Sequence, residues 1–244
     1  LDGYANDVAA RLGSVAGEAE AVTCGSFLDL NLKILAAELA VRASRLYNES
    51  ARAWSSDPVT ALQNLALASA YLDEAELWLR RVEGGYAPDA RQAAATYLSV
   101  ARTTWSYAYS VLSQAGGSTD LANLAGFYYR AATALYSAGR SFLAAVAAAK
   151  AVALAEAALL AYQFSASGAD VYLKTSRIQA EAAASKAPDS LAAVYFINYS
   201  ALAGSASDAI AWLKHATHLG NLALELGGGA AAPRGGAPQQ DQRP

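Results

Sequence analysis

Alanine dominates this chain, and its alanine-rich stretches are interrupted at intervals by glycine, proline, serine and aspartate. Alanine is the strongest helix former, because it loses no side-chain entropy when it is ordered in a helix. No stretch keeps the alternation of apolar and polar residues that is typical of a strand. The sequence therefore predicts an all-α fold in which small side chains let the helices pack closely.

Local signals predict where these helices begin and end. Ser26, followed three residues later by Asp29, is typical of a helix start, and so is Asp57 before Pro58. Paired glycines at 84–85 and 116–117 predict helix ends. Short loops predict antiparallel hairpins, about seven to nine helices in all, arranged as a multi-helix bundle or a short solenoid. We expect the helices at about 4–22, 26–54, 58–83, 89–115, 119–139, 141–164, 170–186 and 189–226, the last with a pause near Gly204.

Composition divides the chain into two parts. Residues 1–226 form the expected helical domain, whereas residues 227–244 consist mainly of glycine, alanine, proline and glutamine. Such a segment has little to bury and is typical of a disordered tail or linker. The chain begins at Leu1 rather than at methionine, so we expect a processed or excised piece of a larger protein, with a membrane anchor as one element that could follow the tail.

The stretch from Phe142 to Phe164 is long enough to span a bilayer. Lys150 and Glu156 interrupt it, and a charge near the centre of a membrane helix is costly. We therefore expect the buried central helix of a bundle, in which both charged side chains reach a helix rim or pair with neighbours. No membrane span is predicted within the chain.

Charge and motif content argue against several functions. The net charge is −3, the charges are scattered, and no basic stripe is present that would bind nucleic acid. Phosphate-binding loops, metalloprotease motifs and nucleophile elbows are absent from the sequence, so we expect neither an enzyme nor a bound cofactor. For the single cysteine, Cys24, we expect a small buried residue in a turn, with a reactive thiol or an intermolecular disulfide as the alternative.

His215 and His218 are the two histidines, and they are three residues apart on one expected helix. This spacing can present two imidazoles to zinc or copper, which predicts a metal site that needs a third ligand from elsewhere. The alternative is a pair of surface histidines near a helix C-terminus, where positive charge is mildly favourable.

Large aromatic residues gather on several expected helices, where the main expectation is that they fill the core of an alanine-rich bundle. The consecutive residues Phe127, Tyr128 and Tyr129 cannot all face one core, so at least one of them should point outward. With Trp105 and Tyr109, we interpret them as candidate anchors of an interface that takes a peptide, a lipid or another subunit.

Asn48 and Asn198 each begin an N-glycosylation acceptor sequence. This pair favours an extracellular or cell-surface location over the cytoplasm. Arginine outnumbers lysine, and together with the high alanine content this favours a GC-rich genome and a thermophilic source.

One expected hairpin carries part of a known repeat pattern. Leu135, Gly139, Ala144 and Ala151 have the spacing of a large residue, the turn glycine and two small positions in a tetratricopeptide repeat, although Ala148 replaces a bulky residue. The hairpin resembles one such repeat, which implies a short TPR-like solenoid as the alternative to the bundle. No clean repeat follows at the family's period, so an array is not expected.

The stretch 128–162 also resembles, in its general pattern of residues, the helical C-terminal region of archaeal membrane-associated Lon-like serine proteases. This resemblance implies that residues 1–226 are a helical appendage and that the glycine-rich tail leads to an anchor. The Ser–Lys pair of that family belongs to a catalytic domain for which this sequence has no counterpart, so no catalytic residue is carried over.

Three functional hypotheses stay open. The first is a non-catalytic helical interaction or scaffold module, an extracytoplasmic appendage of a larger archaeal protein, that binds a protein partner. The second is a self-associating structural subunit of a cell-surface assembly. The third is a metal or small-molecule binder built on the two histidines.

Overall fold

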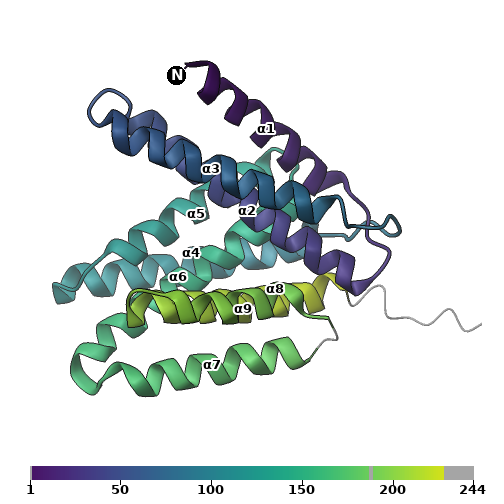
Figure 1. Ribbon diagram of the computed structural model, residues 1–244. Helices are drawn as coiled ribbons and strands as arrows, with labels where there is room; N and C mark the ends of the chain where they lie inside the picture. Colours follow the sequence, from purple (N-terminus) through teal and green to yellow (C-terminus); the bar gives the residue numbers. More distant parts are fainter. Residues whose placement is uncertain (1, 187–188, 228–244) are drawn as a thin grey trace, which may run out of the picture.

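The computed structural model in Figure 1 describes residues 2–186 and 189–227. Apart from Gly227, the predicted tail lies outside the described residues. Within these ranges the chain is helical and contains no strand, which confirms the all-α prediction. The helices are α1 (Asp2–Ala21), α2 (Phe27–Ala53), α3 (Pro58–Leu79), α4 (Arg91–Ala115), α5 (Asp120–Ser137), α6 (Ser141–Ser167), α7 (Ala169–Ser185), α8 (Leu191–Tyr199) with the 3-10 turn η1 (Ser200–Leu202), and α9 (Ala206–Gly227).

The predicted helix starts are confirmed where a capping side chain defines them. The Ser26 hydroxyl accepts a hydrogen bond from the backbone N–H of Asp29 at 3.1 Å and caps α2. Asp57 caps α3 in the same way. The predicted loop at 165–168 is wrong, because α6 continues to Ser167 and only Gly168 separates it from α7.

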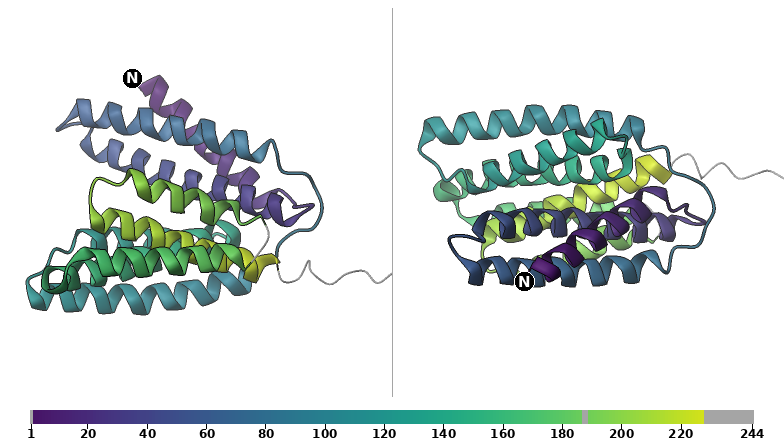
Figure 2. Two further views of the ribbon diagram at one scale, coloured as in Figure 1. Left: turned by 60° about the horizontal axis from the view of Figure 1, so that its bottom comes forward. Right: turned by 90° about the horizontal axis from the view of Figure 1, so that it is seen from above.

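Two helices, α2 and α6, form the interior of the bundle (Figures 1 and 2). Helix α2 packs against α1, α3, α6, α8 and α9, and α6 packs against α1, α2, α4, α5, α7 and α9. Residues 29–43 of α2 and 142–155 of α6 are buried on every side. Among the described helices only α6 is long and apolar enough to cross a membrane, and most of it is buried within the bundle. The prediction of a central core helix is confirmed.

The α1–α2 and α3–α4 connections are joined by a pair of backbone hydrogen bonds. The N–H of Cys24 donates to the carbonyl of Tyr86 at 2.8 Å, and the N–H of Tyr86 donates back at 2.7 Å. Cys24 is fully buried there, as expected of a small residue in a turn, and burial raises the pKa of its thiol to about 11. The thiol is therefore protonated at neutral pH, which argues against the reactive-thiol alternative.

Candidate functional site

Buried polar residues on α2 differ in what they bind. Near the start of the helix they complete neighbouring backbone ends. Asp29 accepts hydrogen bonds from the N–H groups of Gly25 and Glu83, and Lys33 donates to the carbonyls of Glu20 and Val22. The burial of Asp29 and Lys33 is explained by these helix ends, whose backbone groups have no partner within their own helix. Glu38 and Arg42, one and two turns further along, have no such backbone role.

Glu38 is the centre of a buried charge cluster that draws on three helices. Its Oε1 atom accepts a hydrogen bond from Arg42 Nε at 2.5 Å and is also contacted by Lys150 Nζ of α6. His215 Nε2 of α9 lies 3.2 Å from the same oxygen. The four side chains are between 0 and 6 % exposed, so their charges interact with little screening by solvent.

Burial and the neighbouring charges shift the protonation of these groups. Burial alone would raise the pKa of Glu38, but Lys150, His215 and Arg42 together hold it well below its usual value. Burial lowers the pKa of Lys150 most, and the positive charge of Arg42 lowers it further. The negative charge of Glu38 raises it in part, and the result is a pKa of about 7. Burial likewise lowers the pKa of His215 to about 4. At neutral pH Glu38 is therefore ionised, His215 is neutral, and Lys150 is close to its titration midpoint.

Aromatic rings hold the guanidinium of Arg42 in place. Its central carbon lies 4.2 Å from the ring centroid of Trp212 and 5.0 Å from that of Phe196. The rings of Tyr71 and Tyr199 lie 5.8 and 6.0 Å away. Such cation–π contacts stabilise a buried guanidinium without using its N–H donors.

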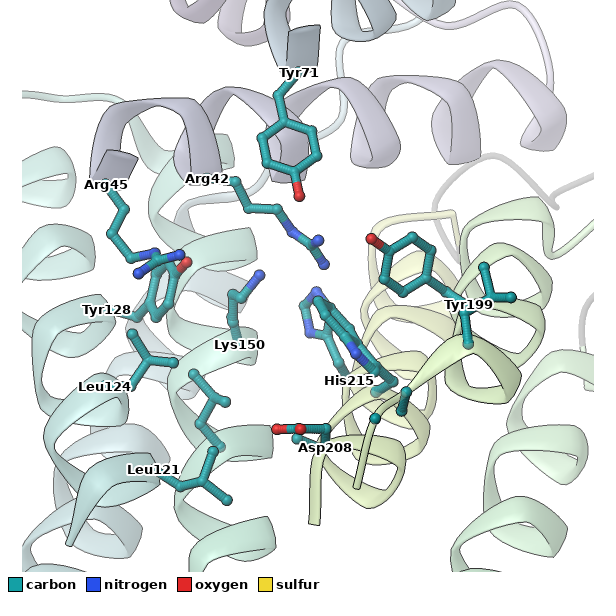
Figure 3. A pocket seen from close by; sticks show the side chains of 16 residues that line it. Arg42, Arg45, Tyr71, Leu121, Leu124, Tyr128, Lys150, Tyr199, Asp208 and His215 are labelled. Atoms are coloured by element: carbon teal, nitrogen blue, oxygen red, sulfur yellow. The ribbon is translucent and has the colours of Figure 1, made fainter. Parts of the chain in front are cut away.

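The charge cluster faces a cavity of about 360 Å³ between α2, α5, α6 and α9 (Figure 3). The side chains of Arg42, Lys150 and His215 line its inner end, and Asp208 lies exposed at its rim. The remaining lining is largely apolar or aromatic and comes mainly from Tyr71, Leu121, Leu124, Tyr128, Leu154, Tyr199, Leu202, Ala203, Ala211 and Trp212. A cavity of this size with a few convergent polar groups is typical of small-molecule sites.

Several polar atoms of the cluster are left without hydrogen bonds. Arg42 Nη2, Glu38 Oε2 and His215 Nδ1 are buried and have no partner among the described residues. Arg45, at the side of the same cavity, pairs with Glu49 through Nη1 at 2.6 Å, while its buried Nε has no partner among the described residues. Buried polar groups are nearly always paired in folded proteins, so these atoms mark a place where a ligand or water completes the structure.

The two histidines predicted to bind a metal turn to different partners. His215 lies against Glu38, whereas His218 Nε2 lies 3.3 Å from Glu156 Oε1. The other carboxylate oxygen of Glu156, Oε2, lies 3.4 Å from Lys214 Nζ. No group of three or more His, Cys, Asp or Glu side chains that could hold a metal ion occurs in the described part of the chain. The structure therefore gives no support to a zinc or copper site. Of the two arrangements predicted for the charged residues of α6, a helix rim or pairing with neighbours, the structure shows pairing: Lys150 with Glu38, and Glu156 with Lys214 and His218.

The predicted aromatic anchors are distributed differently from the expectation. Tyr128 is 1 % exposed and lines the cavity, so it cannot meet an outside partner. Phe127 and Tyr129 are half-buried, and Tyr129 stacks on the half-buried Trp105 at 5.5 Å between ring centroids. Tyr109 is exposed on α4. Of the three consecutive rings, Tyr128 is fully buried, whereas Phe127 and Tyr129 pack against the core and remain partly exposed, so their role as anchors stays a prediction.

Both predicted glycosylation sequences lie on helices. Asn48 and Asn198 are exposed, but the serines that complete the two sequences, Ser50 and Ser200, are 2 and 4 % exposed. The Asn48 amide also donates to the carbonyl of Ser44 at 2.9 Å. Acceptor sequences are expected in surface loops, whereas these two lie on helices, and their use stays a prediction.

Sequence reasoning identified His215 and Lys150 but missed Glu38 and Arg42. A Glu–Arg pair at positions i and i+4 looks like a surface ion pair. The available signal was the surrounding run at 34–41, in which Glu38 is the one charged residue among alanine, leucine, isoleucine and valine. A charge within so apolar a stretch must be buried and paired.

Comparison with known proteins found no matching protein family, no matching characterised protein and no matching solved structure. The resemblances to a tetratricopeptide hairpin and to the Lon-like appendage therefore stay predictions.

Proposed function

We propose that this chain is a helical binding module that takes a small organic anion, a carboxylate with an apolar body, into the cavity beside Arg42. The observation that carries the proposal is the buried Arg42 guanidinium, which belongs to the lining of the cavity and whose Nη2 has no hydrogen-bond partner among the described residues. A guanidinium nitrogen is a donor only, and a carboxylate is the acceptor that fits it best.

The charges around the cavity support an anionic ligand. Whenever Lys150 is protonated, Glu38 alone balances both Lys150 and Arg42, because His215 is neutral. An uncompensated charge in the interior is costly, and a bound carboxylate removes that cost. Leucine and aromatic side chains fill the rest of the lining, so the body of the ligand is apolar.

Calorimetry with a matched pair of probes tests the proposal. We expect 4-methylpentanoate to bind with one site per chain and 4-methylpentanamide, which has the same shape without the charge, to give no measurable heat. In the Arg42→Met variant we expect the affinity for the acid to fall by about 30-fold or more, because losing one partner of a buried charged hydrogen bond costs about 2 kcal/mol or more.

Arg177→Met is the matched control, since Arg177 lies on α7 with a side chain that is 47 % exposed. It should bind the acid as the wild type does. Equal binding of acid and amide, or no binding of either, would refute the anion site. The proposal concerns binding and requires no turnover, in line with the expectation that the chain is not an enzyme.

A second function is favoured by α3, which carries large exposed apolar side chains on its outer side in addition to its buried inner side. Its inner side, which includes Leu65 and Leu72, is buried. On its outer side Val59, Leu67 and Leu77 are 66, 51 and 46 % exposed, and Figures 1 and 2 show α3 at the edge of the bundle. Helices that are apolar on all sides are normally covered. We propose that this face packs on the same face of a second copy, since an apolar stripe on one helix is self-complementary.

Light scattering across a concentration series tests this self-association. We expect the wild-type mass to rise above that of the monomer with concentration, and the Leu67→Glu/Leu77→Glu variant to stay monomeric, because two buried carboxylates would face each other across the contact. Val171→Glu, on α7 with its side chain 67 % exposed, is the control and should assemble as the wild type does. A wild-type monomer at every concentration would rule the contact out.

A further inference from the structure

We propose that Lys150 forms an imine with a carbonyl-bearing anion, a 2-oxo acid, that is held by Arg42 in the same cavity. The inference rests on the proposed anion site and narrows its ligand to compounds that carry a ketone next to the carboxylate. Lysine is the residue that forms imines with carbonyl compounds, and it does so when it is desolvated or lies next to another cation. Lys150 meets both conditions.

The two cations are placed for a ligand of this shape. Arg42 Nε and Lys150 Nζ contact the same carboxylate oxygen, Glu38 Oε1, so the two nitrogens are no more than two hydrogen-bond lengths apart. In a 2-oxo acid the carboxylate and the carbonyl carbon are directly bonded. Arg42 and Lys150 also line the same cavity, so we expect a 2-oxo acid whose carboxylate meets the Arg42 guanidinium to have its carbonyl carbon near the Lys150 amine.

The surroundings of Lys150 favour its reactive form. Its Nζ lies 4.9 Å from the ring centroid of Tyr128 and 5.5 Å from that of Trp212, and it lines the cavity. Burial lowers the pKa of this amine to about 7, so a large fraction is neutral and nucleophilic near neutral pH. An exposed lysine is almost entirely protonated there.

The buried charges balance both before and after the reaction. With Lys150 neutral, Glu38 balances Arg42. In the adduct, the ligand carboxylate balances Arg42, and the protonated imine at Lys150 balances Glu38. No charge is left alone in the interior at either stage, which is the condition for a stable buried cluster.

The reaction needs no oxidant or cofactor. The Lys150 lone pair forms a C–N bond to the carbonyl carbon, and the carbonyl oxygen takes up a proton. The nitrogen then loses one proton, the hydroxyl leaves as water with another, and a C=N bond forms. The overall change is amine plus ketone plus one proton from the solvent to protonated imine plus water. The neutral His215 ring, whose Nε2 lies 3.2 Å from the Glu38 oxygen that Lys150 also contacts, lies close to the amine and can exchange these protons.

Reductive trapping tests the inference on the wild-type protein. The protein is incubated with 4-methyl-2-oxopentanoate and sodium cyanoborohydride, and the products are measured by intact mass and peptide mapping. We expect one added ligand, less one oxygen atom, on Lys150, with little at the other lysines, Lys33, Lys174, Lys186 and Lys214. Adducts no more frequent at Lys150 than at the exposed Lys174 would overturn the inference.

Two variants and a second ligand separate this inference from the anion site. Lys150→Arg keeps the charge and should lose the adduct, whereas Lys174→Arg, an exposed control, should keep it. Binding of 2-hydroxy-4-methylpentanoate, which lacks the ketone, is measured by calorimetry. If this ligand binds but the oxo acid leaves no adduct at Lys150, the imine is wrong and the anion site stands. If neither ligand binds and no adduct forms, both are wrong.

Discussion

Glu38→Gln is expected to lower the free energy of unfolding by about 3–5 kcal/mol at pH 7, the cost of removing one partner from a buried ion pair. Glutamine has nearly the same volume, so packing does not contribute. The loss arises because the buried Arg42 guanidinium would have no carboxylate beside it, and Lys150 would have to give up its proton. Urea denaturation followed by circular dichroism of the helical signal measures the change.

The loss in the free energy of unfolding caused by Glu38→Gln should depend on pH. Lys150 has a pKa of about 7 in the folded protein and 10.5 when unperturbed. Between these two pH values the unfolded chain binds more protons than the folded protein. The free energy of unfolding of the wild type therefore increases as the pH rises through this window. Removing Glu38 lowers the folded pKa of Lys150 further. The variant therefore begins to gain stability at lower pH than the wild type, and the difference between them should be smaller at pH 9 than at pH 6.

Glu181→Gln on α7 is the control for this prediction. Glu181 is 57 % exposed and lies 3.9 Å from Arg177, and a surface pair of this kind contributes at most about 1 kcal/mol. If Glu38→Gln costs no more than Glu181→Gln, the carboxylate of Glu38 does not hold the cluster together.

Gly85→Ala is expected to cost about 1–3 kcal/mol or more, the range for forcing an extra carbon into a closely packed site. A Cβ atom at this position would lie 2.3 Å from the carbonyl oxygen of Cys24 and 2.6 Å from the Cα of Gly25. Both are backbone atoms, and the Cys24–Tyr86 hydrogen bonds fix them in place. The two connections, α1–α2 and α3–α4, must therefore move apart where the Cys24–Tyr86 hydrogen bonds hold them together.

The neighbouring glycine offers a control in the same loop. At Gly84 a Cβ atom would meet only the Thr23 hydroxyl oxygen at 3.4 Å, an ordinary contact. Gly84→Ala should leave stability unchanged or raise it by up to about 1 kcal/mol, because alanine restricts the unfolded chain. Thermal unfolding of the two variants side by side is the measurement. Equal stabilities of the Gly84→Ala and Gly85→Ala variants would mean that the two connections pack less closely at Gly85 than the structure shows.

Local chemistry explains why the fold was largely predictable. The helix starts at Ser26 and Asp57 depend on side chains that bind their own backbone a few residues on, so a short window of sequence contains the whole cause. The end of α6 was misjudged because the serines and alanine at 165–167 are compatible with both helix and loop. Tertiary packing decides such ambiguous stretches, and a local window does not contain it.

The candidate site was harder to predict, since its parts come together only in the folded bundle. Lys150 meets Glu38 across 112 residues of sequence, and no local spacing relates them. His215 and His218 were grouped because they share a helix face, yet the packing of α9 against two different carboxylates separates their roles. Spacing along one helix shows which side chains are neighbours on that helix, not what faces them.

The burial of Cys24 has a consequence for sulfur chemistry. The chain has one cysteine and no methionine, so that thiol is its single sulfur atom. Peroxide attacks thiolates and exposed thioethers first, and this fold presents neither. Oxidants that damage methionine-rich cores have no matching target in this bundle, so its packing should survive oxidative conditions that inactivate proteins with sulfur at their surfaces.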